Sequence, residues 1–92
     1  MTVLDIVVLS VAFTAMGDSV FGKVQVVLSE GSETRTVTLD CRTPASRRIR
    51  PDALLVGEAI RQLRRMPEIR SGQARLRFSR GLRPIANQSN VA

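Results

Sequence analysis

One stretch of this 92-residue chain, Asp52–Met66, has the apolar periodicity of an amphipathic helix, and the other patterned stretches alternate as strands do. Its apolar residues recur along one stripe of a 3.6-residue period: Leu55, Val56, Ala59, Ile60, Leu63 and Met66. Pro51 suits the first turn of a helix, and Pro67 prevents continuation beyond Met66. We therefore predict a single helix, which is too little to cover both faces of a sheet.

Four segments have the patterns expected of strands. Val3–Ala15 is rich in β-branched residues and is apolar on both faces in its first part, which is typical of a strand inside a sheet. Lys23–Leu28 and Thr34–Cys41 alternate apolar and polar residues, and a Glu-Gly-Ser turn signal at 30–32 separates them. Gln73–Ser79 alternates in the same way. The elements thus follow the order β-β-β-α-β.

This order predicts an α+β fold, a two-layer sandwich in which one amphipathic helix packs on one face of a four-stranded mixed sheet. Consecutive hairpins make the first three strands antiparallel, and a right-handed crossover through the helix returns the fourth strand in parallel. We expect the strand order 4-1-2-3, which places the doubly apolar first strand inside the sheet. The alternatives are a fourth strand placed elsewhere or exchanged between two chains, which would use the same residues. The chain is long enough for one domain, residues 1–86, followed by a frayed polar tail at 87–92.

The apolar run Ile6–Met16 has the length of the hydrophobic region of a signal peptide. However, no basic residue precedes it, and Asp5 stands where a positive charge is expected. The run is also far shorter than the roughly twenty residues of a membrane-spanning helix. We therefore expect no membrane association and a cytoplasmic location, with which the single Cys41 agrees, because thiols stay reduced in that compartment.

The inventory of reactive residues argues against an enzyme. The chain has no His, Tyr or Trp, so the usual general base near neutral pH is absent. A lone Cys cannot form an internal disulfide or supply a zinc site, and Cys41 falls on the apolar face of its strand, where a thiol is inert. We expect no metal, no cofactor and no catalysis. Three Phe are the only aromatic residues, so few side chains can stack on bases.

Charge is distributed unevenly along the chain, whose formal net charge is +6. Residues 1–41 contain two basic and five acidic residues, whereas residues 42–92 contain twelve Arg and three acidic residues, so the two parts carry −3 and +9. This asymmetry indicates a basic surface for an anionic partner, or acidic and basic surfaces that meet between copies of the chain. A genome biased toward G and C would give the same Arg excess without any binding.

The densest group of charges leads into the helix. Arg42, Arg47, Arg48 and Arg50 lie in the connector 42–51, which ends at the helix N-terminus. The helix dipole and the free backbone N–H groups favour an anion at that point. We predict that these arginines bind an anionic partner, and phosphates of nucleic acid are the favoured class, read with low sequence specificity.

Two further arginines, Arg75 and Arg77, are expected on the sheet face that the helix leaves open, and we add them to the predicted anion-binding residues. The opposing interpretation is that the connector arginines point into solvent or pair with Asp40, Asp52 and Glu58. The alternative function is a protein–protein interaction or homo-oligomeric assembly module. Apolar residues on the open face would need cover, and a second copy of the sheet could supply it in a homodimer.

Overall fold

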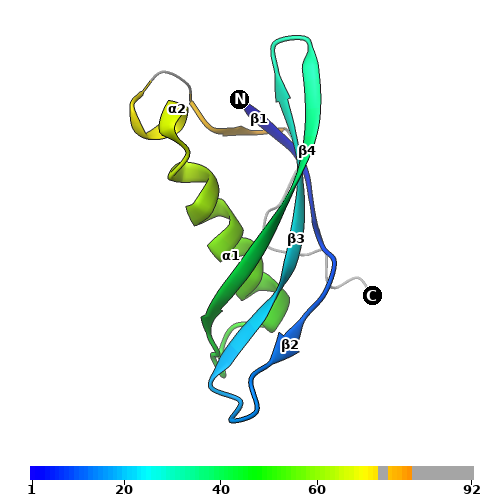
Figure 1. Cartoon of the computed structure of the whole chain (residues 1–92), viewed down its shortest axis with the longest axis vertical. Helices are drawn as coiled ribbons and strands as arrows, with labels where there is room; N and C mark the ends of the chain where they lie inside the picture. Colours follow the sequence, from blue (N-terminus) through cyan, green and yellow to red (C-terminus); the bar gives the residue numbers. More distant parts are fainter. Residues whose placement is uncertain (73–74, 80–92) are drawn as a thin grey trace.

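The computed structural model describes residues 1–72 and 75–79. Along the chain the elements are β1 (Thr2–Val8), β2 (Ala12–Phe13), β3 (Ser19–Glu30), β4 (Glu33–Pro44), α1 (Pro51–Arg64), α2 (Pro67–Arg70) and β5 (Arg77–Phe78). The strands form one mixed sheet, and α1 lies along one face of it (Figure 1). The α+β class is therefore confirmed. The expected domain limit at residue 86 and the tail at 87–92 lie outside the described residues.

β3 lies at the centre of the sheet. β4 pairs with it antiparallel along its whole length, from Ser19↔Pro44 to Glu30↔Glu33. β1 and β2 share the other edge of β3, both antiparallel, and β5 joins β1 in parallel. The predicted strand count is wrong, because the first expected strand, Val3–Ala15, is divided into β1 and β2. The order departs from 4-1-2-3 in the same respect, with β2 as an additional partner of β3.

The first strand is interrupted where it passes Gly22. A Cβ on Gly22 would overlap the backbone carbonyl of Ser10, and it would stand 3.0 Å from Cδ1 of Leu55. The N–H of Leu9 donates to the carbonyl of Lys23 at 2.8 Å. The hydroxyl oxygen of Ser10 accepts the N–H of Lys23 at 3.1 Å. A side chain thus replaces a regular ladder partner at this point, and the close approach of the two backbones requires glycine.

The β3–β4 hairpin is longer than the predicted strands Lys23–Leu28 and Thr34–Cys41. Gly31 is the first of its two loop residues and has a φ of 63°, the sign that a type II′ turn requires at this position. β3 begins at Ser19, four residues before the predicted start at Lys23, and the Val20 side chain is fully buried. The result is a long ribbon whose open end leads toward α1 (Figure 1).

α1 packs its apolar stripe on the sheet. The buried stripe residues are Leu55, Val56, Ala59 and Leu63, and the buried sheet residues in the same cluster are Val3, Ile6, Val20, Val24, Val26, Leu28 and Cys41. α1 ends at Arg64 rather than at the predicted Met66. The reason is Pro67, because a residue before proline disfavours helical backbone, and Met66 is extended with φ −61° and ψ 140°.

The last predicted strand, Gln73–Ser79, is represented by β5, in which Arg77 pairs with Thr2 and Phe78 with Val3. Part of that prediction lies outside the described residues. No helix in the described part of the chain is long and apolar enough to cross a membrane.

Candidate functional site

Four of the six arginines predicted to bind an anion lie at one end of the molecule. Arg42 is near the end of β4, because the structure extends that strand into the predicted connector. Arg47, Arg48 and Arg50 lie in the remaining part of the connector, residues 45–50, at the lower end of Figure 1. All four residues are exposed. The connector cannot spread them far, because a chain spans at most about 3.6 Å per residue. We call these four residues the arginine-rich end.

Arg75 and Arg77 are exposed but lie at the opposite end. Arg77 pairs with Thr2, and Thr2 pairs with Ser29 next to the tip of the β3–β4 hairpin. Arg42 stands about eight residues further along this hairpin, a separation of roughly 26 Å. The structure therefore brings four of the six predicted residues together and places the other two apart from them.

The connector has an ordered backbone. The N–H of Ala45 donates to the carbonyl of Asp18 at 3.0 Å. The hydroxyl oxygen of Ser46 accepts the N–H of Arg48 at 3.0 Å and that of Ile49 at 3.2 Å. A serine that bonds the backbone two and three residues ahead stabilises a turn. The connector arginines are thus carried on a turn with fixed hydrogen bonds.

The acidic residues that could neutralise the arginine-rich end are mostly engaged with other bases. The ion pairs are Lys23–Asp40 at 2.7 Å, Arg61–Glu58 at 2.7 Å and Arg50–Asp52 at 3.6 Å. The opposing interpretation therefore holds for Arg50. Within the described residues, no ion pair includes Arg42, Arg47 or Arg48.

Arg42 does have a carboxylate in its surroundings. The hydroxyl of Thr14 donates to Oδ1 of Asp18 at 2.6 Å. This bond contributes most to lowering the pKa of Asp18, a backbone hydrogen bond adds to it, and the positive charge of Arg42 lowers it further. Asp18 is thus ionised at neutral pH and offsets part of the charge of Arg42.

The N-cap residue of α1, Arg50, makes no side-chain cap hydrogen bond, but part of the N-terminus is satisfied from within the helix. Oδ1 of Asp52 accepts the N–H of Ala53 at 2.9 Å, and the first regular helical bond joins the N–H of Leu54 to the carbonyl of Arg50 at 3.0 Å. Pro51 has no N–H to offer. The anion site expected from free backbone N–H groups therefore has few donors left, so an anion at this end must be held mainly by guanidinium groups.

A hollow opens on the sheet face that α1 leaves uncovered. It is lined by Ser10, Phe21, Gly22, Lys23, Asp40, Cys41 and Arg42 and has a volume of about 450 Å³. Phe21 is directly opposite Arg42 in the β3–β4 ladder and is 41% exposed. The predicted strand Lys23–Leu28 begins after Phe21, so the sequence pattern did not place this residue in the sheet. Alternation with Lys23, Gln25 and Val27 was the signal that could have found it.

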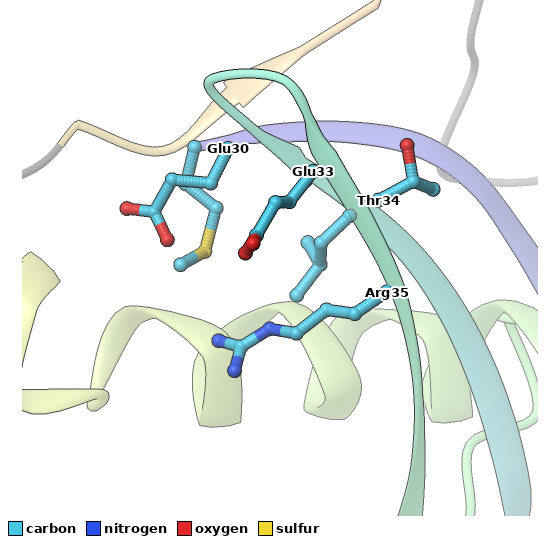
Figure 2. Close-up of a pocket in the computed structure, with 6 residues that line it drawn as sticks. Glu30, Glu33, Thr34 and Arg35 are labelled. Carbon is cyan, nitrogen blue, oxygen red and sulfur yellow. The ribbon is translucent and has the colours of Figure 1, made fainter.

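A second pocket, of about 320 Å³, lies at the tip of the β3–β4 hairpin. The side chains of Glu30, Glu33 and Arg35 extend from the hairpin toward the side on which α1 lies (Figure 2). Glu30 and Glu33 are direct cross-strand partners, an arrangement of like charges that weakens a hairpin. Their carboxylates repel phosphate, so this pocket does not extend the arginine-rich end.

Cys41 is a buried thiol, as its position on the apolar face of the strand predicted. Its Sγ lies 3.8 Å from the carbonyl oxygen of Leu39 and 3.9 Å from Nε2 of Gln62. Burial raises the pKa of the Cys41 thiol to about 11, and the negative charges of Glu58 and Asp40 add to the rise. The thiol therefore stays protonated, and a nucleophilic role has no support. No group of three His, Cys, Asp or Glu that could hold a metal occurs among the described residues.

The raised pKa of Cys41 predicts a loss of stability in alkaline solution. An unfolded thiol ionises at about pH 8.5, whereas the folded thiol keeps its proton, so stability is full below that pH and falls as the pH rises toward the folded pKa. We expect the wild type to lose about 2 kcal/mol more than a Cys41→Val variant between pH 7.5 and pH 10.5. Urea unfolding at the two pH values measures the difference, and parallel losses in both proteins would contradict it.

The fold and the site define a small basic α+β protein with an exposed arginine-rich end beside an open sheet face. Comparisons with protein-family models, with curated proteins and with solved structures gave no match for this chain.

Proposed function

We propose that this protein is a non-catalytic binding module that contacts the phosphates of nucleic acid through the arginine-rich end, with low sequence specificity. One observation carries the proposal. Three exposed arginines, Arg42, Arg47 and Arg48, stand at one end of the molecule, on an ordered turn and a strand end, and take part in no ion pair among the described residues. A cytoplasmic location, where such a partner is accessible, belongs to the same proposal.

The size of the cationic group sets the expected salt dependence. Each neutralised phosphate releases condensed counterions, and about three contacts on a single strand weaken binding roughly twentyfold between 50 and 200 mM salt. Anisotropy titrations of labelled single-stranded and duplex oligonucleotides at the two salt concentrations measure this change. Absence of binding at low micromolar protein in 50 mM salt would refute the proposal.

Self-association is the second candidate function, and the free edge of β4 favours it. Among the described strands, β4 pairs with β3 alone. A two-residue loop makes its flanking pair hydrogen-bonded, so Thr34, Thr36 and Thr38 direct their backbone groups away from β3. Gln62 donates to the carbonyl of Asp40 at 2.8 Å and so caps one further group of this edge. Unpaired strand edges are templates for pairing with a second chain.

Light scattering distinguishes the two candidates. A dimer that persists at both salt concentrations and a lack of oligonucleotide binding would favour assembly through β4. A monomer that binds oligonucleotides would favour the nucleic-acid module.

A further inference from the structure

The hollow on the open sheet face combines an exposed aromatic ring with an exposed cation. Phe21 and Arg42 are direct cross-strand partners on the face turned away from α1, so their side chains leave the sheet side by side. On the next outward pair, Nζ of Lys23 lies 2.7 Å from Oδ1 of Asp40. The charges of Lys23 and Asp40 offset each other on that side of the hollow, so the net positive charge of the hollow comes from Arg42.

The volume of the hollow, about 450 Å³, is within the range of small-molecule binding sites. Gly22 and Cys41 face each other between the two outward pairs, and their side of the sheet is turned toward α1. Only the backbone of Gly22 and Cys41 therefore forms the floor of the hollow, between the Phe21–Arg42 pair on one side and the Lys23–Asp40 pair on the other. A flat group can thus approach the sheet closely and lie against the ring of Phe21.

Charge complementarity selects the occupant. Arg42 belongs both to the hollow and to the arginine-rich end, so the two surfaces share this residue. A ligand that covers both must carry a flat apolar group next to repeated negative charges. Single-stranded nucleic acid has this composition, because its unpaired bases are free to stack on an aromatic ring while its phosphates contact arginine. The bases of a duplex are already stacked and cannot enter.

We infer that the hollow holds one base of a single-stranded nucleic acid, stacked on Phe21, while Arg42 and the connector arginines hold the adjacent phosphates. The inference rests on the proposed function and narrows its partner to the single-stranded form. It also assigns a role to Phe21, whose side chain is 41% exposed.

The test compares strands with and without bases. The probes are a 12-nucleotide single strand that contains one 2-aminopurine and a strand of equal length made of abasic units. Stacking on one aromatic side chain is expected to make the base-bearing strand bind roughly tenfold more tightly than the abasic strand, and to quench the 2-aminopurine fluorescence. A Phe21→Leu variant is expected to lose both effects and to keep its affinity for the abasic strand.

Phe13 offers a matched control, because it is 51% exposed but lies in β2, where it pairs with Val20 of β3, and does not line the hollow. A Phe13→Leu variant is expected to behave as the wild type does. Urea unfolding of both variants verifies that each is folded in the assay.

The possible results separate the inference from the proposed function. Equal affinity of the wild type for the two strands would overturn the inference and leave phosphate binding standing. Failure of both strands to bind would overturn both. A dimer that Phe21→Leu dissociates, together with unchanged oligonucleotide affinity, would show that a second copy occupies the open face and would also overturn the inference.

Discussion

Replacing Gly22 by alanine is expected to lower the free energy of unfolding by about 2–3 kcal/mol, the upper part of the usual range for overpacking a tight site. The added methyl group would overlap the carbonyl oxygen of Ser10, a backbone atom that cannot rotate away. Relief requires the chain at Ser10 to move. Such a movement would strain the hydrogen bonds that Lys23 makes with Leu9 and Ser10, which hold β1 and β2 to β3.

Gly57 provides the matched control within the same protein. It lies inside α1, and a Cβ built there meets no atom within 4 Å. A Gly57→Ala variant is therefore expected to be more stable than the wild type by about 1 kcal/mol, because alanine favours helix over glycine. Urea unfolding of the two variants measures both changes. If Gly22→Ala proved as stable as the wild type, the close crossing at Ser10 would not be what divides the first strand.

The helix could be predicted from the sequence because the information is local. Prolines at 51 and 67 limit it, and its apolar stripe lies within a single segment. The same holds for the hairpin, where Gly31 sits between two alternating runs. These features depend on neighbouring residues, so a pattern that extends over a few positions is sufficient to find them.

The division of the first strand could not be predicted, because its cause is a contact between distant residues. Leu9, Val11 and Phe13 alternate as a buried strand face would, yet they are 51%, 43% and 51% exposed. The chain leaves the regular ladder where Ser10 meets Gly22. Nothing in the pattern of either segment alone shows that these two residues touch.

The residues of the candidate site also divide into those that a local pattern reveals and those that only contacts between distant segments bring together. The connector arginines were found because they are close in sequence. Arg75 and Arg77 were grouped with them by charge, but the parallel pairing of β5 with the start of β1 carries them to the other end of the molecule. The pairing of Phe21 with Arg42 joins residues about twenty positions apart, and it emerges only once the register of the hairpin is known.

Reversing two charges of the arginine-rich end is expected to weaken single-strand binding roughly hundredfold at 50 mM salt. Arg47→Glu and Arg48→Glu together remove two of about three phosphate contacts and place two negative charges beside the phosphates of the bound nucleic acid. The slope of log affinity against log salt is expected to shrink from about −2 to about −0.7, because one contact remains. Both residues are exposed, so the fold is expected to keep its stability within about 0.5 kcal/mol.

The matched control makes the same change of net charge elsewhere. Arg64 and Arg65 are exposed at the C-terminal end of α1, in the layer opposite the open sheet face. A variant with Arg64→Glu and Arg65→Glu has the same net charge as the first variant, so its affinity is expected to fall only by the general loss of long-range attraction, severalfold at 50 mM salt. Equal losses in the two variants would mean that total charge, and not the position of the arginines, governs binding, and the assignment of the interface to this end would fail.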